Sequence, residues 1–169
     1  MLLSPTLFYI HPMHTFKQLM FALAIALAAQ LASARDLPDS RLTTGYINPE
    51  VTQENIHSTV CVKGYSKSIR PPSYYTNKLK KKQLAEYGYT DANPQHYEED
   101  HLIPLSIGGS PDHPKNLWPQ PRLSEWNAEK KDRLEFKIYR LVCEGKVPLD
   151  EARQAMAENW IEAYKRYMN

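Results

Sequence analysis

Two short apolar stretches separated by a glycine turn define the centre of this chain. They are residues 102–105 and 116–119, and Gly108 and Gly109 lie between them together with Pro111 and Pro114. Apolar runs bounded by glycine and proline are typical of strands joined by a loop. The pattern therefore predicts a β-hairpin with a wide loop in the second half of the chain.

Two helical patterns follow the predicted hairpin. A helix is expected from Ser124 as N-cap to a stop at Gly145, which would place Asn127 in its first turn. A second helix is expected over about residues 149–167. Apolar positions recur at helical spacing in both segments: Leu134, Ile138, Leu141 and Val142 in the first, and Ala152, Met156, Trp160, Ala163 and Tyr167 in the second. Strands followed by helices, without an internal repeat, predict an α+β fold.

The first 34 residues differ sharply from the rest. They contain no acidic residue and one strong base, Lys17, which precedes an apolar run over residues 19–29 and the small residues Ala32-Ser33-Ala34. This order is typical of a cleaved secretory signal. The alternative is an uncut anchor, but eleven apolar residues are too few to span about 30 Å of hydrocarbon. We therefore predict a protein exported to the periplasm or secreted, without stable membrane insertion after cleavage, in which residues 35–56 form a loosely ordered lead-in and 57–169 a single domain.

Beyond residue 34 the charges nearly balance, because 20 Lys and Arg face 19 Asp and Glu. Any affinity for nucleic acid must then come from a local patch. Residues 57–85 provide one, since this segment holds seven basic residues and no acid and is interleaved with tyrosines. The basic residues are Lys63, Lys67, Arg70, Lys78, Lys80, Lys81 and Lys82. Phosphate contact is one interpretation of this segment, and a solvated helix face is the other.

Cys61 and Cys143 are the only cysteines. An exported protein folds where disulfides persist, so we expect these two residues to form a disulfide. Two unrelated buried thiols are the alternative, and metal ligation is less favoured because neither belongs to a Cys-x-x-Cys pair. Residues 60–62 are expected to form a short strand around Cys61.

The residues best suited to chemistry lie around the first apolar stretch: Asp100 and His101 immediately precede it, and Asn116 and Asn127 follow it. Carboxylate and amide oxygens suit a hard divalent cation, and a neutral imidazole can take a proton from an attacking water. Together these groups could hydrolyse a phosphodiester. Adjacent Asp and His on a strand point to opposite faces, so they are expected to hold different roles.

The order and spacing of the elements in residues 98–131 resemble the motif of the HNH endonucleases. The resemblance consists of Asp100-His101-Leu102-Ile103-Pro104-Leu105, then Gly108-Gly109, then Asn116-Leu117, and finally Asn127-Ala128-Glu129-Lys130. The chain looks most similar to small exported members of that family. It departs from many members in having Asn127 where they have His and in lacking paired Cys-x-x-Cys knuckles.

The resemblance implies a ββα-metal finger of two antiparallel strands and a helix. In it His101 is the general base, Asn116 orients the strand that bears His101, and Asp100 and Asn127 are metal ligands. An amide in place of His at position 127 favours Mg²⁺ or Mn²⁺ over Zn²⁺. The candidates for substrate binding are Arg70, Lys78, Lys80, Lys81, Lys82 and Lys130.

Three functions are compatible with these features. The first is an exported metal-dependent endonuclease that hydrolyses phosphodiester bonds, with DNA favoured over RNA. The second is a non-catalytic exported protein that binds nucleic acid and keeps the finger as a scaffold. The third is a structural or envelope-associated domain, since fold does not fix function.

Overall fold

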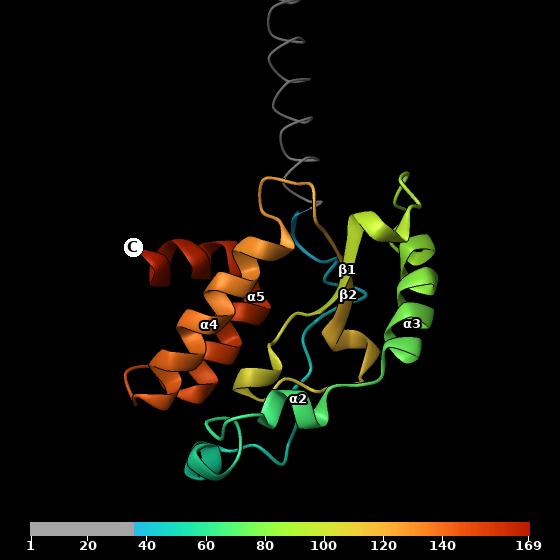
Figure 1. Ribbon diagram of the computed structural model, residues 1–169. Helices are drawn as coiled ribbons and strands as arrows, with labels where there is room; N and C mark the ends of the chain where they lie inside the picture. Colours follow the sequence, from blue (N-terminus) through green and yellow to red (C-terminus); the bar gives the residue numbers. More distant parts are fainter. Residues whose placement is uncertain (1–35) are drawn as a thin grey trace, which may run out of the picture. The chain divides into compact units, whose positions relative to one another are not determined.

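The computed structural model describes residues 36–169, so the predicted signal segment, residues 1–34, lies outside the described residues (Figure 1). None of the described helices is both long and apolar enough to cross a membrane. The described elements, in chain order, are η1 (Gln53–Ser58), α2 (Tyr65–Ile69), α3 (Ser73–Glu86), η2 (Pro94–His96), β1 (Tyr97–His101), η3 (Leu105–Ile107), η4 (Pro114–Asn116), β2 (Leu117–Pro121), α4 (Ala128–Cys143) and α5 (Leu149–Met168).

Strands β1 and β2 form the antiparallel hairpin that the sequence predicts. Tyr97 pairs with Pro121 at one end, and His101 pairs with Leu117 at the other, next to the connecting loop. The first strand consists of polar residues that precede the predicted apolar stretch, because residues 102–105 turn away into the loop and η3. The hairpin is therefore confirmed, and its first strand lies about five residues earlier than the apolar pattern suggested.

The Gly108-Gly109 pair is required by the shape of the connecting loop. Gly108 has φ +78°, a conformation that side chains disfavour. A Cβ on Gly109 would lie 1.8 Å from the carbonyl oxygen of Ile103. The Gly109 N–H donates to the carbonyl of Pro104 at 2.9 Å, which brings the two backbone segments together. Only a residue without a side chain fits this approach.

Helices pack on both sides of the hairpin. In Figure 1, α3 flanks the strands on one side, and α4 and α5 lie together on the other. The apolar stripes predicted for the two last helices form the centre of the core with Trp118 of β2. Fully buried members of this core include Trp118, Leu134, Ile138, Val142, Met156 and Trp160. The α+β prediction is thus confirmed as a hairpin packed against helices, with two long helices at the end.

Helix α4 begins later than the sequence suggested. Asn127 is the N-cap, and its side-chain oxygen accepts a hydrogen bond from the Lys130 N–H at 3.0 Å. The expected start at Ser124 was therefore wrong. An amide oxygen satisfies an N–H group at the first turn as well as a serine hydroxyl does, so either residue is an acceptable N-cap.

The disulfide between Cys61 and Cys143 is present and joins the segment after η1 to the last residue of α4. The short strand expected over residues 60–62 is not. These residues form turns, in which the Cys61 N–H donates to the carbonyl of Ile56 and the Val62 N–H to that of Thr59. A local apolar run is too short to form a strand where no neighbouring strand offers a partner.

Residues 36–56, predicted as a loosely ordered lead-in, pack against the hairpin. Thr43 is 1% exposed, and its hydroxyl donates to the carbonyl of Leu117 at 3.0 Å. The Gly45 N–H donates to the carbonyl of Lys115, and Ile47 forms a β-bridge with Gly109. These contacts are with residues about 60 to 75 positions away, so local periodicity could not reveal them.

Candidate active site

His101 ends β1 with its ring held in one orientation. Its Nε2 lies 2.8 Å from the carbonyl oxygen of Pro111, in the connecting loop. A carbonyl oxygen only accepts hydrogen bonds, so in the neutral ring Nε2 carries the proton. The lone pair is then on Nδ1. This is the tautomer in which Nδ1 can take a proton from water.

The surroundings of His101 favour the neutral ring. The residue is 3% exposed, and burial lowers the pKa of the imidazole. The positive charge of Arg70 lowers the pKa further, whereas the carbonyl of Pro111 and the carboxylate of Asp100 act in the opposite direction. A neutral imidazole is the form that a general base requires.

Asn116 fastens the segment after His101 to the second strand. Its side chain is fully buried and makes four hydrogen bonds to backbone groups. The amide oxygen accepts from the Ile103 and Tyr46 N–H groups at 3.0 and 3.3 Å. The amide nitrogen donates to the carbonyls of Ile103 and Ser110 at 3.0 and 2.9 Å. The position of this side chain is compatible with the expected role of orienting the strand that bears His101.

Replacing Asn116 with alanine should lower the free energy of unfolding by on the order of 3 kcal/mol, because several buried backbone groups lose their partners together. Chemical denaturation measures this loss. Asn48→Ala is the matched control, since Asn48 accepts one hydrogen bond on the exposed surface and its loss should cost about 0.5 kcal/mol or less. Equal effects of the two substitutions would contradict the proposed positioning role.

Asp100 points toward α4 and meets a buried lysine. Lys131 is fully buried, and its Nζ donates to Asp100 Oδ2 at 2.8 Å, to the His101 carbonyl at 2.6 Å and to Glu135 Oε1. Burial alone would lower the pKa of Lys131, but the two carboxylates outweigh it and raise the pKa. The Lys131 ammonium is therefore a fixed positive charge that contacts the Asp100 carboxylate and the backbone carbonyl of His101.

The oxygens expected to bind a metal already accept N–H hydrogen bonds. Asp100 Oδ1 accepts from the His101 N–H at 2.8 Å, and Oδ2 accepts from Lys131. Asn127 Oδ1 caps α4. Among residues 36–169, no group of three or more His, Cys, Asp or Glu side chains is arranged to hold a metal ion. Each of these oxygens accepts one N–H hydrogen bond and keeps a further lone pair, and the metal stays a prediction from the sequence.

The basic candidates for substrate binding are distributed over several places. Lys78 is exposed on α3, while the Lys80 ammonium donates to the Tyr97 carbonyl at 3.1 Å. Lys82 forms an exposed ion pair with Glu86. Lys130 lies over the ring of Trp126, 4.4 Å from its centre. Arg70 is the candidate whose charge acts on His101, and Lys81 lines a cavity beside β1.

The sequence pattern left the role of Glu99 undecided. Both of its carboxylate oxygens are buried and lack a hydrogen-bond partner among the described residues. Burial raises the pKa of Glu99 to about 8, and Asp100 adds to this, while Lys80 acts against it. The carboxyl is thus protonated at neutral pH. A run of three acids, Glu98 to Asp100, indicates charge crowding but not which member has a carboxyl group without a hydrogen-bond partner in the described part of the chain.

Glu99→Gln should stabilise the protein at pH 8 and have little effect at pH 4. The folded state keeps the Glu99 proton up to a pKa of about 8, whereas the unfolded state loses it near 4.5, so wild-type stability falls as pH rises between these values. Each pKa unit corresponds to about 1.4 kcal/mol, and we expect a gain on the order of 2 kcal/mol at pH 8. Urea unfolding at both pH values measures it.

The control is Glu129→Gln, whose side chain is 78% exposed. It should change stability little at either pH. A gain from Glu99→Gln that is the same at pH 4 and pH 8 would contradict a buried, protonated carboxyl.

The comparisons with known proteins add no further information about this site. No protein-family model matches the chain, and no curated protein or solved structure matches it.

Proposed function

We propose that this protein is an exported nuclease that hydrolyses phosphodiester bonds in nucleic acid, with DNA favoured over RNA. In this proposal β1, β2 and α4 correspond to the ββα finger of the HNH endonucleases. The supporting features are the order of these elements, the Asp100-His101 pair at the end of β1 and Asn127 at the start of α4. The disulfide is compatible with export, because such bonds persist in oxidising compartments.

The observation that carries the proposal is the fixed ring of His101. Nδ1 accepts a proton from water while the oxygen of that water attacks phosphorus. The electron pair of the breaking P–O bond then leaves with the departing oxygen, which takes a proton from solvent. Nε2 stays bound to the Pro111 carbonyl throughout, so the imidazolium that forms is stabilised by a hydrogen bond and by the nearby Asp100 carboxylate.

Arg70 is the basic side chain best placed to contact the substrate at this site. Its charge acts on both His101 and Asp132, and no ion pair or hydrogen bond to another described residue occupies it. A guanidinium suits a phosphate because it donates two parallel hydrogen bonds. Arg70 would thus bind the phosphodiester and offset the charge that builds up on phosphorus.

A second candidate function is binding of nucleic acid without cleavage. The observation that favours it is that the oxygens of Asp100 and Asn127 are occupied by N–H donors. Such a protein would bind nucleic acid with strong salt dependence and leave it intact.

The deciding experiment incubates the oxidised protein with supercoiled plasmid, single-stranded DNA and RNA, each with Mg²⁺, Mn²⁺ or EDTA. We expect nicking and degradation of DNA. Cleavage that EDTA abolishes would support the expected divalent ion. Cleavage that persists in EDTA would be compatible with His101 as the base and would exclude a divalent ion from the mechanism. Binding without any cleavage would identify the second candidate.

The acid limb of the pH profile tests the state of His101. Because burial lowers the pKa of this imidazole, kcat/KM should stay high as pH falls through about 6.5, the ordinary value for histidine, and decline only below it. Initial rates over pH 4 to 8 measure this. An acid limb centred at or above 6.5 would contradict a buried, neutral base.

A further inference from the structure

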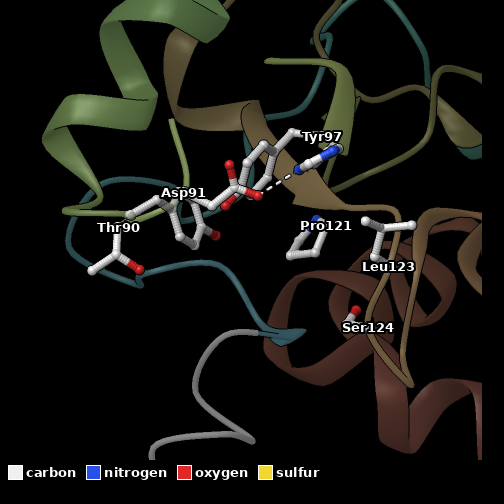
Figure 2. Close-up of a pocket in the computed structure, with 8 residues that line it drawn as sticks. Thr90, Asp91, Tyr97, Pro121, Leu123 and Ser124 are labelled. Atoms are coloured by element: carbon white, nitrogen blue, oxygen red, sulfur yellow. Dashed lines mark hydrogen bonds and ion pairs between the residues drawn. The ribbon is translucent and has the colours of Figure 1, made fainter. Parts of the chain in front are cut away.

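A small cavity with aromatic walls lies at the end of the hairpin away from His101. It has a volume of about 220 Å³ and is bordered by the first residue of β1, Tyr97, and its pairing partner Pro121 at the end of β2. Figure 2 shows Leu123 on one side of the cavity and Thr90 and Asp91 on the other. Cavities that enclose drug-sized ligands measure roughly 300–1,000 Å³. This one has room for a single ring system.

The walls suit a flat aromatic ring. Tyr89 and Tyr97 line the cavity with ring centres 4.9 Å apart, and Tyr87 stacks on Tyr89 from behind at 5.6 Å. Leu123 lies at the rim and is 77% exposed, so its apolar side chain is accessible to a bound ring. Nucleobases stack on such surfaces whatever their sequence, because every base has an apolar face.

One edge of the cavity can hydrogen-bond a base. Asp91 and His96 both line it, and their carboxylate oxygen and Nδ1 are 2.6 Å apart, as the dashed line in Figure 2 marks. The carboxylate is half exposed and keeps further acceptor capacity. Nucleobases present N–H donors at their edges, and carboxylates accept from them.

A basic cavity adjoins the aromatic one and shares Tyr97 with it. Lys80, Lys81 and Arg122 line this second cavity, whose volume is about 480 Å³. Arg122 pairs with Glu98 and Lys80 with a backbone carbonyl, whereas Lys81 makes no ion pair with another described residue. Pro121 and Leu123 line the aromatic cavity while Arg122 between them lines the basic one. A nucleotide needs an aromatic surface for its base and a neighbouring basic surface for its phosphate.

We propose that the two cavities together bind an unpaired nucleotide of a single-stranded nucleic acid, with the base packed against the Tyr89–Tyr97 pair on one side and Leu123 on the other, and with the phosphate on Lys81 and Arg122. This inference rests on the proposed function and names its substrate class. In a duplex the base faces are stacked and covered, and flipping a base out costs unpairing and unstacking energy, so the cavity favours a base of an unpaired strand. Four residues of β1, about 13 Å, separate Tyr97 from His101. The bound nucleotide therefore lies beside the scissile bond, not at it.

The test measures binding by fluorescence anisotropy in the His101→Ala variant, so that the probe stays intact. The probes are a labelled (dT)8 strand, an eight-residue strand with abasic sites throughout, and an eight-base-pair duplex. We expect (dT)8 to bind at least tenfold tighter than the other two. Leu123→Ala and Tyr89→Leu should each weaken (dT)8 binding at least fivefold and leave binding of the abasic strand unchanged.

Two further variants separate base from phosphate binding. Lys81→Gln should weaken both single strands and reduce the slope of log K against log salt by about 0.7. Phe136→Ala is the control, because Phe136 is 65% exposed on α4 and does not line either cavity; it should change nothing. A circular dichroism melt confirms that each variant is folded.

Equal binding of (dT)8 and the abasic strand would overturn the subsite, as would an unchanged affinity in both folded variants, Leu123→Ala and Tyr89→Leu. The outcome is separate from that of the nuclease proposal. Base-dependent binding without cleavage by the wild type would refute the nuclease and keep the subsite. Cleavage by the wild type without base-dependent binding would support the nuclease and refute the subsite.

Discussion

Replacing His101 with alanine is expected to reduce the rate of DNA cleavage by about 10² to 10⁴, because it removes the proposed general base. The loss should appear mainly in kcat, since the substrate contacts proposed for Arg70 and the lysines of α3 are unchanged in this variant. Single-turnover rates on a labelled strand measure it. His57→Ala is the matched control, because His57 is exposed on η1, far along the chain from the hairpin.

The folded fraction must be compared alongside the rate, because His101 is buried and its ring donates to the Pro111 carbonyl. His101→Gln keeps an amide N–H at about the position of the imidazole Nε2, so it can donate to this carbonyl but supplies no base. Loss of cleavage in a folded His101→Gln protein would assign the effect to chemistry. Wild-type turnover in either variant, at an equal folded fraction, would remove His101 from the mechanism.

Removing the disulfide is expected to lower the free energy of unfolding by about 4 to 5 kcal/mol. Cys61 and Cys143 are 82 residues apart, and in the chain-entropy model closing so long a loop restricts the unfolded state by about this amount. Domains are typically stable by about 5 to 15 kcal/mol, so the reduced chain would be marginal. If the protein is the exported nuclease proposed above, its reduced form would be poorly active before export, which would spare the DNA of the producing cell.

Cys61→Ser and Cys143→Ser should therefore lower the melting temperature substantially and by similar amounts. The double variant should lose no more than either single one, because both break the same bond. Thermal melts with and without reductant, together with a free-thiol count on the wild type, measure this. Two titratable thiols in the native protein, or additive losses in the double variant, would contradict the bond.

The hairpin and the two last helices could be read from the sequence because their signals are local. Gly108-Gly109 marks a turn whatever surrounds it, and apolar positions at helical spacing identify the face of α4 that is buried in the core. The ends of elements were less certain. Ser124 and Asn127 are both good N-caps, and the choice between them depends on where the chain leaves β2.

The sequence could not predict the partners of individual side chains. Lys131 follows Lys130 on a helix, and by pattern both are surface residues of similar type. The fold buries Lys131 against Asp100, 31 residues away, while Lys130 lies over Trp126. The lead-in was misjudged for the same reason, because its buried contacts are with the hairpin loop about 60 to 75 residues on.

By itself, the sequence determined the hairpin, the two last helices and the residue types at the candidate site, and it made Cys61 and Cys143 the one possible disulfide, because local spacing and composition are enough to specify these. Only the tertiary structure decided which nitrogen of His101 carries its proton, which carboxyl of the acidic run is left without a hydrogen-bond partner among residues 36–169, and that one oxygen of Asp100 accepts from a buried lysine. These properties depend on distance and burial. Both arise when segments far apart in the chain pack together.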